Sequence, residues 1–140
     1  MVKSYEHVVK YYETDKMGIT HHSNYVRWME EARIDFLSQI GWKFEELEAR
    51  GIASPVVAVE CRYRIPTTFP EVIRISVSVE EFKGVKLKLK YRMLNSEDKE
   101  VCTGRSEHCF LDGNGRPLRM NKEFPDFYKT LQSLAEQSGN

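Results

Sequence analysis

The spacing of apolar residues changes once along the chain, and this change limits the fold more than any other feature. From Tyr25 to Ile40, apolar residues recur at intervals of three and four, which is the period of a helix with one broad apolar face. That face comprises Tyr25, Trp28, Met29, Ala32, Phe36, Leu37 and Ile40. Ser23 or Asn24 can cap the start of this helix, and Gly41 is a stop signal after it. Beyond Pro55 the period becomes two.

Alternating apolar and polar residues beyond Pro55 predict antiparallel strands. The clearest runs are Ile73, Ile75, Val77 and Val79, then Val85, Leu87, Leu89, Tyr91 and Met93, the latter alternating with Lys86, Lys88, Lys90 and Arg92. The short Lys83-Gly84 turn between the two runs predicts a hairpin. Further strands are predicted at Val56–Ile65 and, after a turn at Asn95–Lys99, at Val101–Leu111.

The remaining segments complete an α+β pattern. We expect a short strand at Val8–Tyr12, a short helix at Phe44–Arg50, and a C-terminal helix at Glu123–Glu136 followed by a polar tail from about residue 136. One helix followed by a run of strands predicts a curved antiparallel sheet wrapped around that helix, not βαβ repetition. A chain of 140 residues predicts a single domain, residues 1–140.

Charge and composition narrow the classes of partner. The chain has 21 basic and 21 acidic residues, so no strong overall field attracts nucleic acid. No apolar stretch approaches the ~20 residues that span a membrane, and the N-terminus lacks the apolar run of a signal peptide. Three cysteines without a CxxC spacing predict free thiols. These features together predict a cytoplasmic protein without a membrane span.

Residue types that often act in catalysis are clustered just before and at the start of the long helix. They are Asp15, His21, His22, Ser23, Asn24 and Tyr25. Free N–H groups and the positive dipole end at a helix start can polarise a carbonyl or stabilise an oxyanion. A carboxylate near such a group suggests acyl-group hydrolysis. The alternative is structural, with Asp15 closing an Asx-turn and the histidines in a solvated loop.

The same segment carries a resemblance to a known family. The string Y-x-x-T-D-x-M-G-x-x-H-H-S-N-Y-x-x-W-x-E-x-A-R, ending at Arg33, resembles the signature of 4-hydroxybenzoyl-CoA thioesterase-like proteins. Further matches include Thr103-Gly104 and Asp112-x-x-Gly115-Arg116-Pro117, so the resemblance covers about residues 5–130. It implies a hotdog fold, a five-stranded antiparallel sheet around the long helix, that works as a homodimer or a homotetramer.

The resemblance also implies an activity and roles for individual residues. The activity is hydrolysis of acyl-CoA thioesters, in which Asp15 is the catalytic carboxylate, as nucleophile or as general base for water. The backbone N–H of His22 polarises the thioester carbonyl. Asn24 and Tyr25 match the family's Asn-Tyr pair, and we expect them to contact the substrate; the alternative for Tyr25 is that it simply packs under the helix. The chemistry requires no metal and no cofactor, because CoA is part of the substrate.

The phosphates of CoA predict a basic binding surface. Three sources are available, namely the stripe from Lys86 to Arg92, the pair Arg62 and Arg64, and the pair Arg116 and Arg119. The loop that contains Arg116 and Arg119 is the preferred one. A lysine stripe along a strand is also typical of a solvated sheet face that resists aggregation.

Two other functions remain open. The hotdog fold also hosts acyl dehydratases and hydratases, but this sequence lacks their H-x-x-x-x-P-x-x-P-G-x-x-x-x-E pattern. The chain could also bind acyl-CoA or acyl-carrier protein without hydrolysing it. The sequence does not define the acyl chain length or the choice between aromatic and aliphatic acyl groups.

Overall fold

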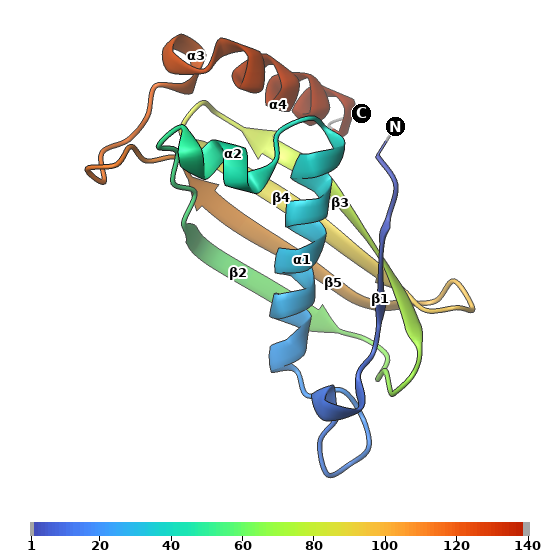
Figure 1. The fold of residues 1–140 in the computed structure, drawn as a ribbon. Coiled ribbons are helices and arrows are strands. Elements are labelled where there is room, and N and C mark those ends of the chain that lie inside the picture. Colours follow the sequence, from blue (N-terminus) through green and yellow to red (C-terminus); the bar gives the residue numbers. More distant parts are fainter. Residues whose placement is uncertain (1, 139–140) are drawn as a thin grey trace.

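The five strands form one antiparallel sheet in the order β1-β3-β4-β5-β2 (Figure 1). In chain order they are β1 (Tyr5–Val8), β2 (Val56–Tyr63), β3 (Val72–Phe82), β4 (Lys86–Leu94) and β5 (Glu100–Cys109). These assignments come from a computed structural model, which describes residues 2–138 of the chain. The predicted hairpin is confirmed, since β3 and β4 pair in antiparallel register, with Val77 opposite Tyr91.

Helices cover one face of this sheet. They are α1 (Ser23–Gln39), α2 (Phe44–Ala49), α3 (Met120–Glu123) and α4 (Pro125–Ser138), and a 3-10 turn, η1 (Tyr11–Glu13), precedes α1. Figure 1 shows α1 lying along the sheet, and α4 lies near the C-terminal end of α1. This is the predicted α+β hotdog architecture, with the sheet curved around the long helix.

The apolar face of α1 forms the centre of the core, as its spacing predicts. Trp28, Met29, Ala32 and Phe36 are buried against inward-facing side chains of the sheet. Gly104 of β5 allows this close approach, because a Cβ there would lie 3.0 Å from both Sδ and Cε of Met29. The opposite side of α1 is exposed, so the helix is only half-enclosed by its own chain.

Three predicted elements are wrong in detail. The N-terminal strand is Tyr5–Val8 instead of Val8–Tyr12, because the Glu13 side chain accepts a hydrogen bond from the Lys10 N–H and closes η1. Neither Ser23 nor Asn24 caps α1, since the residue before the helix is His22, without a side-chain cap. The C-terminal helix is divided into α3 and α4 where Pro125 follows Phe124.

Candidate active site before helix α1

A small hairpin carries Asp15 and returns the chain to the start of α1. The His21 N–H donates to the Glu13 carbonyl at 2.8 Å, and the Asp15 N–H donates to the Ile19 carbonyl at 2.9 Å. Between these bonds, Thr14 and Thr20 form an antiparallel bridge. The structure therefore brings Asp15 and His22 into one local unit, as the sequence analysis predicted.

The half-buried carboxylate of Asp15 also shapes the tip of this hairpin. Its Oδ1 accepts a hydrogen bond from the Met17 N–H at 2.8 Å, which is an Asx-turn. Gly18 completes the turn with a φ of 78°. The structural role considered for Asp15 is therefore present. The turn uses one carboxylate oxygen, Oδ1. Within residues 2–138 no hydrogen bond is donated to the other oxygen, Oδ2.

The backbone N–H of His22 differs from its neighbours at the start of α1. The Ser23 N–H donates to His21 Nδ1 at 3.2 Å, and the Asn24 N–H donates to the His21 carbonyl at 3.0 Å. The Tyr25 N–H donates to the His22 carbonyl at 3.3 Å. In the described part of the chain the His22 N–H has no acceptor, so it is the amide of this turn that is available to a carbonyl oxygen.

The ring of His22 contacts two neighbouring rings, those of His21 and Tyr63. The His22 ring stacks on His21, with ring centroids 4.3 Å apart, and meets Tyr63 of β2 edge to face at 6.2 Å. The Tyr63 hydroxyl donates to the His22 carbonyl at 3.3 Å. The start of α1 is thus held against the C-terminal end of β2.

A buried carboxylate, that of Glu13, was not predicted from the sequence. Its side chain is 6% exposed, and it receives hydrogen bonds from the Lys10 N–H and the Trp28 indole N–H, both at 2.8 Å. His7 Nε2 lies 2.8 Å from Glu13 Oε1, the oxygen that also accepts from the Lys10 N–H. Burial raises the pKa of Glu13, but these hydrogen bonds outweigh it and hold that pKa below its ordinary value. Glu13 therefore remains ionised and fixes the base of the Asp15 hairpin.

Asn24 and Tyr25 point inward from the start of α1. The Asn24 amide donates to the carbonyl oxygens of Glu13 at 2.9 Å and His21 at 3.2 Å. The Tyr25 hydroxyl lies 2.9 Å from Thr67 Oγ1, and its ring is buried. Burial raises the pKa of Tyr25, so the phenol stays protonated. Both side chains thus stabilise the hairpin and the helix start, and a contact of either with substrate stays a prediction.

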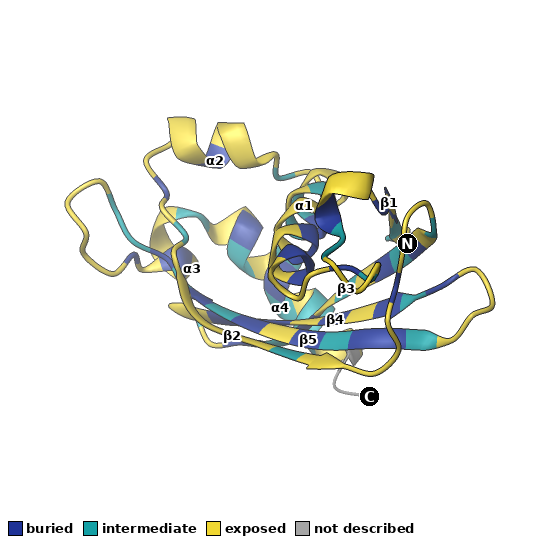
Figure 2. Ribbon diagram, turned by 90° about the horizontal axis from the view of Figure 1, so that it is seen from below, coloured by how far each residue is buried: buried dark blue, intermediate teal, exposed yellow. Residues whose placement is uncertain are grey.

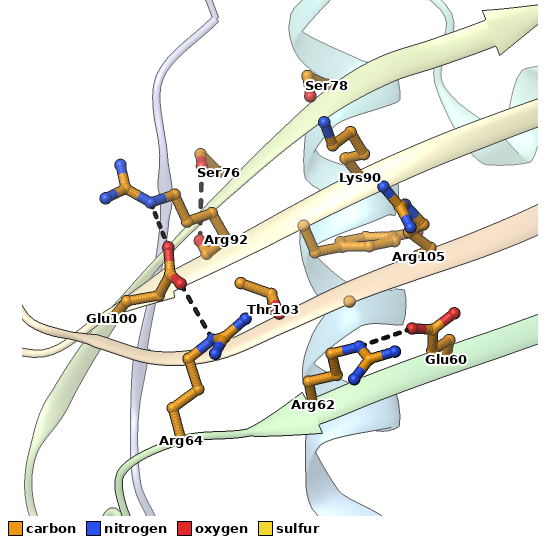
Figure 3. Close-up of a pocket in the computed structure, with 12 residues that line it drawn as sticks. Glu60, Arg62, Arg64, Ser76, Ser78, Lys90, Arg92, Glu100, Thr103 and Arg105 are labelled. Atoms are coloured by element: carbon orange, nitrogen blue, oxygen red, sulfur yellow. Dashed lines mark hydrogen bonds and ion pairs between the residues drawn. The ribbon is translucent and has the colours of Figure 1, made fainter.

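Basic residues from three strands lie together on the outer face of the sheet, away from α1. A groove of about 550 Å³ is lined by Arg62, Arg64, Lys90, Arg92 and Arg105, with Glu60 and Glu100 among them. Figure 3 shows these side chains on the strands that carry them. Arg64 and Arg92 both pair with Glu100, at 3.1 and 2.7 Å. Two of the three predicted basic sources therefore form one surface, in which carboxylates partly neutralise the positive charge.

Arg116 and Arg119 lie far from the Asp15 hairpin of the same chain. Their loop follows β5 and is tied to the start of β2 by an antiparallel bridge between Leu111 and Ala53 (Figure 1). His22 instead contacts Tyr63 at the end of β2. The eight residues of β2 separate these two places by roughly 23 Å. One chain alone therefore does not unite the predicted catalytic and phosphate-binding residues.

No group of three or more potential metal ligands occurs among residues 2–138. Within the same range, none of the helices has the length and apolar character needed to cross a membrane.

The chain matches known proteins along most of its length. Residues 9–133 match the model of the thioesterase-like superfamily. The protein YneP of Bacillus subtilis is 31% identical over 125 residues, which cover 89% of this chain and 91% of YneP.

Solved structures agree with this match. A DHNA-CoA thioesterase from Staphylococcus aureus superposes with a TM-score of 0.92 at 29% identity, covering 99% of this chain and 95% of that one. The BH1999 gentisyl-coenzyme A thioesterase superposes with a TM-score of 0.79 at 26% identity, covering 86% of this chain and 97% of that one. Sequence and fold together show that this chain belongs to the thioesterase-like superfamily of hotdog-fold proteins.

Proposed function

We propose that this protein hydrolyses acyl-CoA thioesters to a free acid and CoA. The observation that carries the proposal is the His22 N–H, which has no acceptor within residues 2–138 and follows a hairpin bearing the Asp15 carboxylate. The names of the S. aureus and BH1999 relatives, both CoA thioesterases, support the same chemistry.

In the proposed reaction, the thioester carbonyl oxygen accepts a hydrogen bond from the His22 N–H. This interaction strengthens as negative charge develops on the oxygen, with help from the dipole of α1. Asp15 then acts in one of two ways. It attacks the carbonyl carbon to give an anhydride that water hydrolyses, or it takes a proton from the attacking water. In both routes the C–S bond breaks and the CoA sulfur leaves and is protonated.

We further propose that the working unit is a homodimer formed through β2, on which a homotetramer could be built. β2 lies at the edge of the sheet and pairs with β5 on one side only among the described strands. Val57 and Val59 are 52% and 47% exposed, and β2 is almost wholly exposed in Figure 2. An apolar edge strand of this kind is a template for pairing with a second strand.

The symmetry of such a dimer joins the two separated parts of the site. In a two-fold antiparallel pair, the start of one β2 lies beside the end of the other. The loop with Arg116 and Arg119 would therefore come from one subunit, beside His22 of the partner subunit. We propose that these two arginines bind the CoA phosphates across the interface.

Assays of thiol release separate the three candidate functions. Wild-type protein is mixed with a panel of aliphatic and aromatic acyl-CoAs, and free CoA is measured with a thiol reagent. Release of CoA supports the thioesterase. Tight binding with no release from any member would favour the binding module, and hydration of an enoyl-CoA without thiol release would favour a hydratase.

The proposed chemistry uses only protein groups and water, so EDTA should leave the rate of CoA release unchanged. We also propose a cytoplasmic location, which fits three cysteines that are all free thiols. We propose no nucleic-acid partner, in keeping with the zero net charge.

A further inference from the structure

Three sulfur-containing side chains lie beneath α1, at the boundary between β2 and β5. Cys61 of β2 lies under the helix, with its Sγ 3.4 Å from Met29 Sδ. Cys102 of β5 is buried in the core. Both cysteines are free thiols. The structure therefore brings two thiols and a thioether together, two residues before the Tyr63 whose hydroxyl holds the His22 carbonyl.

The register of β2 and β5 makes Cys61 and Cys102 diagonal neighbours. Cys61 is paired with Gly104, and Tyr63 is paired with Cys102. Side chains two positions apart on a strand share a face, so both cysteines point towards α1, and Gly104 places no side chain between them. Diagonal neighbours have Cα atoms roughly 7–8 Å apart, whereas a disulfide needs about 7 Å or less. A bond between these two cysteines therefore requires a small movement of the backbone.

The surroundings of the two thiols give them different reactivity. Cys61 is half-buried, whereas Cys102 is fully buried. The neighbouring Cys102 thiol, which can donate a hydrogen bond to a thiolate, lowers the pKa of Cys61 to about 7; burial opposes this shift and the Tyr63 hydroxyl adds to it. The same interaction, together with burial, raises the pKa of Cys102. Because the thiolate is the reactive form, Cys61 reacts first with an oxidant, and Cys102 is placed to resolve the product.

The position of β2 in the sheet determines which strand can move. β5 is held between β4 and β2, whereas β2 lies at the edge and pairs with β5 alone among the described strands. At the end of β2, the Tyr63 hydroxyl donates to the His22 carbonyl at 3.3 Å, and its ring meets that of Tyr25 edge to face at 5.0 Å. A shift of β2 near Cys61 therefore moves Tyr63 against the start of α1.

From this arrangement we infer that Cys61 and Cys102 are a site of oxidation by peroxide, and that their disulfide displaces the end of β2 and disturbs the start of α1. In the first step the Cys61 thiolate attacks an oxygen of hydrogen peroxide. The O–O bond breaks, leaving a sulfenic acid on Cys61 and a hydroxide that takes up a proton. The Cys102 sulfur then attacks the Cys61 sulfur and loses its proton, the S–O bond breaks, and water leaves. Two thiols are oxidised to a disulfide, and one peroxide is reduced to two waters.

The disulfide does not depend on the proposed function, but its effect on turnover rests on it. If the His22 N–H polarises the thioester carbonyl, a displaced Tyr63 alters the turn that presents this N–H and slows CoA release. The proposed dimer leaves the chemistry possible, because pairing of two β2 strands uses backbone N–H and C=O groups and not the Cys61 side chain. The pair would thus make hydrolysis sensitive to oxidation.

Mass spectrometry tests the disulfide without any catalysis. The Cys109→Ser protein is the starting material, because Cys109 lies on the opposite face of β5 and could link two molecules. After treatment with hydrogen peroxide, we expect the intact mass to fall by two hydrogen atoms, with a cross-linked peptide that contains Cys61 and Cys102. A phosphine reductant should restore the original mass, and the further change Cys61→Ser should abolish the cross-link. Unreacted thiols, or oxygen added to Cys61 without a cross-link, would overturn the inference.

Backbone NMR and turnover test the effect on the site. In the oxidised Cys109→Ser protein, the amide signals of His22 and Tyr63 should shift, while that of Glu6 on β1, at the opposite edge of the sheet, should change little.

After removal of peroxide, CoA release should be about tenfold slower or more and should recover on reduction. The rate is followed by loss of thioester absorbance, since a thiol reagent would also react with the cysteines. Cys109→Ser with Cys61→Ser should keep the same rate before and after peroxide.

The two levels of the proposal fail differently. If the disulfide forms and CoA release is unchanged, the inference that the cysteine pair controls the site is wrong and the thioesterase stands. If the reduced wild-type protein releases no CoA from any acyl-CoA, the proposed function is wrong. The intact mass and the amide signals of His22 and Tyr63 then still decide whether oxidation links Cys61 to Cys102 and displaces β2.

Discussion

The Trp28 indole N–H donates a hydrogen bond to Glu13 Oε2 at 2.8 Å, deep under the first turns of α1. This bond joins the helix to the residue whose carbonyl receives both the His21 N–H and the Asn24 amide. The carboxylate of Glu13 thereby holds the hairpin of Asp15 and the start of α1 in one rigid arrangement. Its role is that of a positioning residue, because it is buried and does not face the proposed substrate.

Replacing this carboxylate by an amide should destabilise the protein. Both oxygens of Glu13 accept hydrogen bonds, so the NH₂ group of Glu13→Gln must face a donor. We expect a loss of about 1–3 kcal/mol in the free energy of unfolding, measured by urea denaturation at pH 7. The exposed Glu6→Gln on β1 is the matched control and should change stability little. Equal midpoints for the two variants would show that the Glu13 network contributes nothing.

Acid should weaken the fold through His108, a buried residue of β5. Because the folded-state pKa is lowered to about 4, the unfolded chain binds a proton between pH 6.5 and 4 that the folded chain does not. The stability contribution is therefore complete above pH 6.5 and is lost as the pH falls through this window. His108→Phe should show a smaller loss of stability than wild type between pH 7 and 4.5, measured by urea denaturation. Identical pH profiles would contradict the burial of a neutral imidazole.

A charge on the edge strand should disrupt the proposed dimer. Val59 lies two residues before Cys61, whose Sγ lies 3.4 Å from Met29 Sδ, so both side chains face the α1 side of the sheet. Val59→Lys should shift the protein to monomer in light scattering and lower CoA release at least tenfold, because the site needs both subunits. Val85→Lys, at a valine of similar partial exposure in the β3–β4 turn, is the control. A fully active Val59→Lys monomer would refute the shared site.

Removal of the two loop arginines should weaken binding of the CoA moiety only. The double variant Arg116→Ala and Arg119→Ala should raise KM for acyl-CoA about tenfold with little change in kcat, since lost phosphate contacts act on binding. An acyl-N-acetylcysteamine thioester lacks the phosphates and should be hydrolysed equally by both proteins. If KM for acyl-CoA is unchanged, the groove of Arg62, Arg64 and Arg92 becomes the better phosphate site.

Local patterns predicted the helices and strands well, because the spacing of apolar residues is set by the period of each element and can be read from near neighbours in the sequence. The alternation that gave the β3–β4 hairpin and the three-four spacing of α1 both survive in the structure. Glu13 was missed since its partners, His7 and Trp28, come from two other elements, and no spacing indicates a buried carboxylate. A usable signal existed for His108, because alternation from Cys102 places Ser106 and His108 on the inward face of β5.

The arrangement of the site was predictable only within the hairpin. The sequence indicated that Asp15 lies close to the start of α1, because Gly18 and the polar residues around it mark a turn between them. The sequence could not show that Arg116 lies far from Asp15. The distance between them depends on the direction of β2 within the sheet. The sequence also could not indicate the dimer that we propose, in which the two residues come together across the interface.

The catalytic role of Asp15 is tested most directly by the rate of CoA release from Asp15→Asn. The asparagine Oδ1 can still accept from the Met17 N–H, so the Asx-turn should persist and stability should be nearly unchanged. Asp126→Asn is the control, since this exposed aspartate lies in the first turn of α4, which packs against β3 and not against β2. We predict that Asp15→Asn lowers kcat by about 10²-fold or more on every acyl-CoA that wild type hydrolyses, while Asp126→Asn retains wild-type kcat. Equal kcat for wild type and a folded Asp15→Asn would contradict the account.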